Sequence, residues 1–206
     1  TEHLHVSISP YYGSCSSPNL MNPIIEKIRS TFEERGSEQY GTEAVTQLQH
    51  ALQSGQLAEE SGAPEPMVTA AMMHDIGHIL SAGLLPVSCE GDLDDKHELV
   101  ANGWIKQHFG PEVADPIRLH VIAKRYLCTK YPKYEIQLSP TSLKSYHDQG
   151  GPMKPEEMAQ FENEPFYQEA LELRKWDDQA KAKDKATPSL SHFIPAMESC
   201  LKQVIE

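Results

Sequence analysis

The chain has 206 residues and a hydrophobic fraction of 39%, which is enough for one well-buried domain and too little for two. Its formal net charge is −12 and its 18 Lys and Arg residues form no basic run, which argues against nucleic acid or an anionic membrane as the main partner. No stretch approaches ~18 consecutive apolar residues, and the N-terminus lacks the basic and then apolar pattern of a secretory signal. We therefore expect a cytoplasmic protein.

The N-terminal half divides into an arm and three helices. Residues 1–20 carry Ser, Pro and Gly without a lasting period and predict an extended arm, whereas residues 21–206 are expected to form one domain. Apolar residues then recur at helical spacing. The predicted helices run from Ile24 to Phe32, from Thr42 towards Gly62, and from the end of "GAPEP" through "MMHDIGHIL" at 72–80.

The C-terminal half continues in the same way. After the loop "SAGLLPVSCEGDLDD", helices are predicted over 96–109, from Pro111 through "HVIAKRYL", over 155–183 and over 189–205. The stretch before residue 155 is irregular apart from one turn near Ser142. No segment shows the sustained alternation or the clustered β-branched residues of a strand, so the predicted fold class is all-α.

The stretch "MMHDIGHIL" sets three polar side chains into a segment that otherwise has the pattern of a buried helix. His74 and His78 stand four residues apart and are predicted on one helix face, with the Asp75 carboxylate alongside. Burying a charge without a partner is strongly unfavourable. Either a metal ion satisfies these groups, or the helix holds a buried hydrogen-bonded pair.

Four further side chains favour the metal ion. The other predicted helices each offer an imidazole or a carboxylate in or beside an apolar segment, and metal sites in the cores of helical bundles are built in this way. These side chains are His50, His97, His120 and Asp177. The sequence therefore predicts a helical bundle with a metal site in its core.

The order of these ligands resembles the HD-domain superfamily in its dinuclear form. Six ligands exceed what one ion needs, and a carboxylate flanked by ligands on both sides can bridge two ions through its two oxygens. The resemblance implies that Asp75 is this bridge. It implies one metal held by His50, His74, Asp75 and Asp177, and a second metal held by Asp75, His97 and His120.

Ligand type does not separate the activities of this superfamily, because imidazole and carboxylate ligands accept Fe, Mn, Zn or Co. Most members are phosphohydrolases, and a smaller branch, which includes myo-inositol oxygenase, binds iron and activates dioxygen. Four segments resemble the PhnZ-type 1-hydroxyphosphonate oxygenases of that branch: "QYGTEAVTQLQH", "HVIAKRYL", "QGGPM" and "RKWD". A phosphohydrolase or phosphodiesterase is the first alternative, and a metal-stabilised helical binding module is the second.

The resemblance also implies roles for side chains near the ligands. Lys124 follows His120 by one helical turn and Arg174 precedes Asp177 by three residues, so each cation is predicted to share a face with a ligand. The implied phosphonate contacts are His78, Lys124, Ser142, Ser145 and Arg174. The implied catalytic residues are Asp75, His78 and Lys124.

Tyr40 and Glu43 are the implied selectivity residues. In relatives that act on a 2-amino substrate, the tyrosine that matches Tyr40 can occupy an iron position until the substrate ammonium engages the glutamate that matches Glu43. The alternative is an ordinary helix start, in which Glu43 only complements the helix dipole.

The implied reaction is O2-dependent cleavage of a C–P bond. A mixed-valent Fe(II)/Fe(III) pair, without reduced nicotinamide, would convert a 1-hydroxyalkylphosphonate that a hydroxylase has made into a carboxylate and inorganic phosphate. The expected substrates carry a 2-trimethylammonio or a 2-amino group in the R configuration and give glycine betaine or glycine.

The N-terminal arm at 1–20 has two interpretations. It is either a free tail, which is common for a terminus of this composition, or a lid over the pocket. As a lid it would bring Tyr11 and Tyr12 to a quaternary ammonium through cation–π attraction, or Cys15 to an iron ion.

Overall fold

The computed structural model describes residues 22–80 and 93–203, of which 93–100 are described without their side chains. The predicted arm lies outside these ranges, together with its three candidate lid residues, Tyr11, Tyr12 and Cys15. The tail and the lid therefore both stay predictions.

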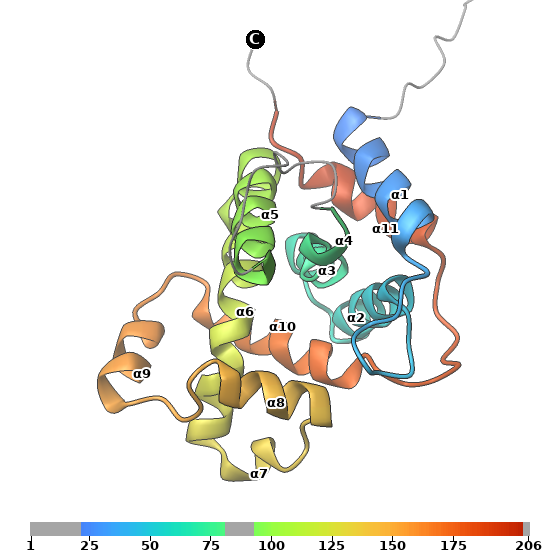
Figure 1. Ribbon diagram of the computed structural model, residues 1–206. Helices are drawn as coiled ribbons and strands as arrows, with labels where there is room; N and C mark the ends of the chain where they lie inside the picture. The colour runs from blue at the N-terminus through green and yellow to red at the C-terminus, as the bar shows by residue number, and fades with distance from the viewer. Residues whose placement is uncertain (1–21, 81–92, 204–206) are drawn as a thin grey trace, which may run out of the picture.

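The all-α prediction is confirmed (Figure 1). The described residues form helices and turns, with one isolated bridge between Gln39 and Thr46 and no strand. None of the described helices combines the length and the apolar character needed to cross a bilayer. The helices are α1 (Pro23–Arg35), α2 (Gln47–Glu60), α3 (Glu65–Met73), α4 (Gly77–Leu80), α5 (Leu93–Phe109), α6 (Pro111–Lys130), α7 (Pro132–Glu135), α8 (Pro140–Asp148), α9 (Pro155–Glu162), α10 (Tyr167–Gln179) and α11 (Leu190–Ser199).

α3 lies at the centre of the bundle and contacts α2, α6, α10 and α11 (Figure 1). Every residue from Met67 to Met73 is buried. A helix that is apolar on all faces is stable only when other elements cover it, which explains its central place. The main apolar core gathers around α3 and includes Phe32, Ile105, Trp176 and Phe193.

α2 starts later than the apolar period predicts. Thr46 caps it in place of Thr42: the Thr46 hydroxyl accepts from the Gln49 N–H at 3.3 Å, and the Gln49 side chain accepts from the Thr46 N–H at 2.9 Å. The prediction of a helix from Thr42 was wrong because the residues before Thr46 form a turn. In this turn the Glu43 N–H donates to the Tyr40 carbonyl oxygen at 2.9 Å. Both selectivity candidates therefore lie on this turn, ahead of the helix.

A close approach of α2 and α3 brings two of the predicted ligands together. A Cβ atom on Gly55 of α2 would lie 2.5 Å from the Met72 Sδ of α3 and 3.0 Å from the Phe193 ring. The missing side chain therefore lets the two helices pack closely. The Nε2 atoms of His50 and His74 lie 3.1 Å apart across the same pair of helices.

The helix predicted through "MMHDIGHIL" is interrupted at residues 74–76. Turn bonds span the break, including one from the His78 N–H to the Asp75 carbonyl oxygen at 3.1 Å. The prediction that His74 and His78 share one helix face was therefore wrong. The His74 imidazole stabilises the end of α3, because its Nδ1 donates to the Ala71 carbonyl oxygen at 2.8 Å. The side chains of His74 and Asp75 remain only 1% and 13% exposed.

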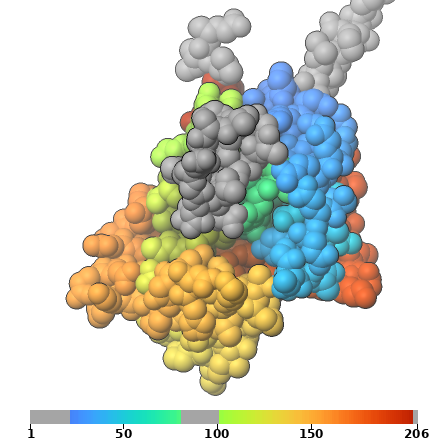
Figure 2. Space-filling model, in the orientation of Figure 1, coloured from blue at the N-terminus to red at the C-terminus, as the bar shows by residue number. Residues whose placement is uncertain are grey.

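The C-terminal half contains further differences from the prediction, and its last helix, α11, ends at Ser199 and not at residue 205. α9 and α10 replace the single helix predicted over 155–183, because a proline at 165 disfavours helical geometry in the residue before it and Phe166 adopts a left-handed conformation with φ 64°. α8 replaces the predicted turn near Ser142, with Ser139 as its cap. α7, α8 and α9 form a lobe beside α6 and α10, drawn in yellow and orange in Figures 1 and 2.

Candidate active site

Four side chains from α2, from the turn after α3 and from α10 converge in the core, and one ligand atom of each lies within 4.8 Å of the others. They are His50, His74, Asp75 and Asp177, which we call the His–Asp cluster. The His50 Nε2 lies 3.4 Å from the Asp177 Oδ1, and the His74 Nε2 lies 3.4 Å from the Asp75 Oδ2. Two donors that are each about 2.1 Å from one ion lie ~3.0–4.2 Å apart, so this spacing fits a metal ion.

The second ring nitrogen of each histidine determines which atom faces the cluster. The Nδ1 of His50 donates to the Ala180 carbonyl oxygen at 2.9 Å, and the Nδ1 of His74 donates to the Ala71 carbonyl oxygen. A neutral imidazole with its proton on Nδ1 carries a lone pair on Nε2. Two such lone pairs 3.1 Å apart, next to two carboxylates, require a cation between them. Imidazole and carboxylate donors in this arrangement suit a transition-metal ion.

The charges of the His–Asp cluster lead to the same requirement. Burial lowers the pKa of His74, but the Asp75 and Asp177 carboxylates outweigh it and raise that pKa to about 10. Burial raises the pKa of Asp75, but the His74 charge holds it well below its usual range, and Arg174 does the same for the pKa of Asp177. The cluster is thus anionic and attracts a cation, which is a proton on His74 or a metal ion in its place.

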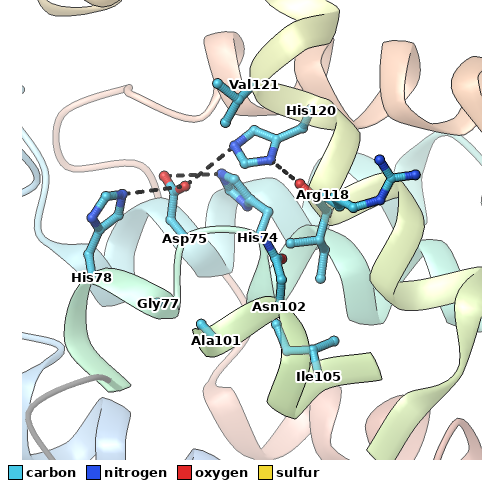
Figure 3. A pocket seen from close by; sticks show the side chains of 11 residues that line it. His74, Asp75, Gly77, His78, Ala101, Asn102, Ile105, Arg118, His120 and Val121 are labelled. Atoms are coloured by element: carbon cyan, nitrogen blue, oxygen red, sulfur yellow. Dashed lines mark hydrogen bonds and ion pairs between the residues drawn. The ribbon is translucent and has the colours of Figure 1, made fainter. Parts of the chain in front are cut away.

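Asp75 faces different groups with its two oxygens. Its Oδ2 belongs to the His–Asp cluster, whereas its Oδ1 lies 3.5 Å from the His120 Nε2 and 3.9 Å from the His78 Nε2. Figure 3 shows these two imidazoles reaching the carboxylate from different sides of a pocket. The His120 Nδ1 donates to a carbonyl oxygen of its own helix at 2.5 Å, so its Nε2 lone pair also faces Asp75. The side chain of His97 in α5, predicted on this side, lies outside the described residues.

Tyr40 lies directly against the His–Asp cluster. Its ring stacks on the His50 ring with the centroids 3.9 Å apart and an interplanar angle of 12°. Its hydroxyl donates to the Asp75 Oδ2 at 2.7 Å and lies 3.5 Å from the Asp177 Oδ1. Burial and both carboxylates raise the pKa of Tyr40 well above its ordinary value, so the phenol keeps its proton. A phenol oxygen therefore lies among the candidate ligand atoms.

Arg174 connects the cluster to the lobe. Its Nη1 lies 2.7 Å from the Asp177 Oδ2, and its Nε donates to the Asp178 Oδ2 at 2.9 Å. Its Nη2 donates to the Ser142 hydroxyl of α8 at 3.3 Å. Arg174 thus orients a candidate ligand with one nitrogen and reaches a predicted phosphonate contact with another.

Lys124 is the second predicted cation, and it is only 3% exposed on α6. Its Nζ donates to the Ser145 hydroxyl at 2.8 Å. Burial and then the Arg174 charge lower its pKa to about 8. Four of the five predicted phosphonate contacts therefore form two pairs of a cation with a serine: Lys124 with Ser145, and Arg174 with Ser142. We call these four side chains the cation pocket. The fifth predicted contact, His78, lies beside Asp75 instead.

Glu43 and Lys181 lie at the edge of the cation pocket. The Glu43 Oε1 accepts from the Ser139 hydroxyl at 2.5 Å and lies 3.9 Å from the Lys181 Nζ. The Lys181 Nζ donates to the Ser142 hydroxyl at 2.8 Å and lies 3.6 Å from the Asp178 Oδ1. A third cation thus joins the two predicted from the sequence.

Lys181 is the residue that the sequence interpretation missed. It follows Asp177 by four residues, which is the spacing that identifies Lys124 after His120. The same rule applied to the last ligand could have found it. The helix predicted over 155–183 contains this position, whereas in the structure α10 ends at Gln179 and Lys181 lies just beyond it.

The fold and the site define the class of protein. It is an all-α bundle of the HD-domain type, in which a buried group of histidines and aspartates suited to a metal ion adjoins two buried cations that bond to serine hydroxyls.

Relatives of the chain identify its family, although no family profile matches it. The chain is 42% identical over 190 residues (91% of its length, 94% of the relative) to hydroxymethylphosphonate dioxygenase of Gimesia maris. It is 39% identical over 177 residues (85% and 89%) to 1-hydroxy-2-(trimethylamino)ethylphosphonate dioxygenase (glycine-betaine-forming) of Leisingera caerulea. It is also 36% identical over 196 residues (93% and 90%) to an uncharacterized protein of Acanthamoeba polyphaga mimivirus. The chain belongs to the family of PhnZ-type 1-hydroxyphosphonate dioxygenases.

Proposed function

We propose that this protein uses O2 to cleave the C–P bond of a 1-hydroxyalkylphosphonate. One O2 is consumed, the carbon next to phosphorus becomes a carboxylate, the phosphorus exchanges its bond to carbon for a bond to oxygen, and one proton is released. The substrate supplies all four electrons. The expected substrates are the R forms with a 2-trimethylammonio or a 2-amino group, made by a preceding hydroxylase, and the products besides phosphate are glycine betaine or glycine.

One observation carries this proposal: the cation pocket, with its buried cations Lys124 and Arg174, adjoins the His–Asp cluster in a chain with two relatives named as phosphonate dioxygenases. The protein as a whole carries a net charge of −12. Buried Lys124 and Arg174 nevertheless place two cations next to serine hydroxyls, and such donors suit a phosphonate dianion.

We propose two iron ions, as an Fe(II)/Fe(III) pair, for the cofactor. The converging Nε2 lone pairs support the first ion, and the two directions of the Asp75 oxygens support a carboxylate bridge to a second. When bound, the ions would supply O2 activation and electron transfer from the substrate. The proposed ligands are His50, His74, Asp75 and Asp177 for one ion, and Asp75, His97 and His120 for the other.

The chain's own side chains would bind and orient the phosphonate. Lys124 and Arg174 would give charge-assisted hydrogen bonds to its oxygens, and the hydroxyls of Ser142 and Ser145 would donate further ones. His78, partly exposed beside Asp75 at the pocket of Figure 3, would complete the contacts. Fixing the phosphonate in this way directs its carbinol carbon towards the His–Asp cluster.

Tyr40 and Glu43 would control when the cluster becomes accessible. The Tyr40 hydroxyl bonds to Asp75 in the free protein and lies among the candidate ligands. Glu43, three residues further along the same turn, would attract the substrate ammonium and move the turn, which releases the hydroxyl from Asp75. Tyr40 would thus protect the cluster until the substrate arrives.

An assay of iron-loaded protein with hydroxymethylphosphonate and with the trimethylammonio substrate tests this function. We expect O2 consumption and phosphate release in equal amounts with at least one of them, and no phosphate release under nitrogen. Phosphate release that persists without O2 would show a phosphohydrolase instead. Metal binding without any turnover, on these substrates and on phosphate esters, would favour a metal-stabilised binding module.

A further inference from the structure

We propose that Lys181 is a further substrate-binding residue, and that its ion pair with Glu43 is exchanged for the two charges of a zwitterionic substrate. In the free protein the Lys181 ammonium faces the Glu43 carboxylate. When the substrate binds, its ammonium takes Glu43 and the Lys181 ammonium turns to its phosphonate. The inference rests on the proposed function, because it assigns a role in the same pocket.

The position of Lys181 links the two ends of the proposed substrate. Its Nζ donates to the Ser142 hydroxyl at 2.8 Å, and the Arg174 Nη2 reaches the same hydroxyl at 3.3 Å. The Glu43 Oε1 lies 3.9 Å away, and the centroid of the Tyr40 ring lies 6.0 Å away. One ammonium therefore touches a predicted phosphonate contact and faces both selectivity residues.

The pair of Lys181 with Glu43 is buried but loose. The two side chains are 10% and 13% exposed, so neither charge can be left without a partner cheaply. Their separation of 3.9 Å exceeds the ~2.7–2.9 Å of a charge-assisted hydrogen bond, so no short bond between the two charges has to break. The Lys181 Nζ also lies 3.6 Å from the Asp178 Oδ1 and 4.0 Å from the Asp177 Oδ1. Both aspartates are already paired with Arg174, whereas Glu43 has no cation but Lys181 within 4.0 Å among the described residues. Glu43 is thus the partner that a substrate ammonium can take over.

The backbone holds Lys181 in place on both sides. The Ala180 carbonyl oxygen accepts from the His50 Nδ1 at 2.9 Å. The Ala182 N–H donates to the Gln53 Oε1 at 3.0 Å, and its carbonyl oxygen accepts from the Gln53 Nε2 at 2.9 Å. α2 therefore fixes the segment that carries Lys181, and a change of partner requires only rotation of its side chain.

The exchange accounts for the charges of a zwitterion. One internal ion pair becomes two pairs with the substrate, and no buried charge is left alone. A phosphonate without an ammonium would also draw Lys181 away, but it would leave the Glu43 carboxylate buried without a cation. Glu43 should therefore assist one class of substrate and oppose the other.

Substitution of Glu43 separates the two classes. We would measure the Kd of hydroxymethylphosphonate and of the trimethylammonio substrate on metal-loaded protein by calorimetry without O2. In Glu43→Gln the Kd of the trimethylammonio substrate should rise about 10-fold to 100-fold, whereas the Kd of hydroxymethylphosphonate should fall several-fold. In Lys181→Met both Kd values should rise about 10-fold or more, because both phosphonates lose a cation.

Two variants serve as controls. Lys181→Arg keeps the charge and should restore most of the binding, and Lys183→Met removes the same charge from an exposed position two residues away and should change neither Kd. Metal content and thermal unfolding are measured on every variant.

Three results would overturn the exchange. They are equal shifts of both Kd values in Glu43→Gln, a Lys181→Met variant that behaves like Lys183→Met, and loss of metal and thermal stability in Lys181→Met. Because binding is measured without turnover, the expected Kd pattern without O2-dependent phosphate release would refute the proposed function and leave the exchange standing. If neither phosphonate binds, both proposals fail.

Discussion

The His–Asp cluster and the cation pocket adjoin each other, but their side chains are held in different ways. In the cluster, the Nδ1 atoms of His50 and His74 each donate to a backbone carbonyl oxygen, so the main chain of the core fixes the ligand atoms. In the cation pocket, Lys124 donates to the side-chain hydroxyl of Ser145 in the lobe. The difference indicates a preorganised centre beside partners that can be exchanged for a ligand.

The largest effect is expected from breaking the cluster. His74→Ala removes one of the converging nitrogens and leaves Asp75 and Asp177 with a weaker cation site. We expect loss of bound metal and of all phosphate release, measured by elemental analysis and by a phosphate assay. His192→Ala is the matched control, because His192 is exposed and pairs only with Glu59 among the described residues. Full metal content in His74→Ala would contradict the ligand assignment.

The cluster is the part of the site that could be predicted from the sequence. His50, His74 and His120 lie in apolar segments, where burial of an imidazole needs a partner, and the structure brings these side chains together with both aspartates. The all-α class followed from helical apolar spacing in the same way. These features depend on local pattern and burial, which a single sequence records.

The missed features depend on bonds between side chains and the backbone, which the spacing of apolar residues does not report. The breaks before Gln47 and after Met73 arise where side chains bond to the backbone, at Thr46 and His74, and helical spacing does not report such bonds. The position of Lys181 depends on hydrogen bonds from two side chains of α2 to the backbone on either side of it. α2 lies more than a hundred positions earlier in the sequence. The spacing from Asp177 can indicate this residue, but only the contacts with α2 determine where it lies.

A smaller effect is expected from the cation pocket. Lys124→Met removes the charge but keeps the buried aliphatic chain, so KM should rise about 10-fold to 100-fold while the metal content stays unchanged. Steady-state kinetics and elemental analysis measure the two quantities. Lys175→Met, on the exposed face of α10, is the control for the loss of one positive charge. Loss of metal in Lys124→Met would show that Lys124 also supports the cluster, and the assignment of separate roles to the two regions would be wrong.

A rise in pH should weaken substrate binding in the cation pocket, because Lys124 loses its charge. Its pKa is lowered from 10.5 to about 8 by burial and by Arg174, so it loses its charge in the free protein as the pH rises through 8. Above that pH, KM should rise by up to about tenfold per unit. Between pH 8 and 10.5 the unfolded chain holds more protons at this residue, so its contribution to the free energy of unfolding should increase with pH as binding weakens. In Lys124→Met, KM should not rise above pH 8. If the rise persists in this variant, another titrating group causes it.

The smallest effect is expected at Ser145, whose hydroxyl accepts from Lys124 at 2.8 Å and from the Gln149 side chain at 3.1 Å. Ser145→Ala leaves the charges of the pocket intact and removes one neutral group, so KM should rise about 2-fold to 10-fold. Ser145→Thr keeps the hydroxyl and should differ from the native protein by less than that. Steady-state kinetics of these two variants measure how much the Ser145 hydroxyl contributes to KM. A rise in KM in Ser145→Ala as large as that in Lys124→Met would mean that this hydroxyl fixes the Lys124 ammonium as rigidly as the backbone fixes the histidines. The contrast between the two regions would then disappear.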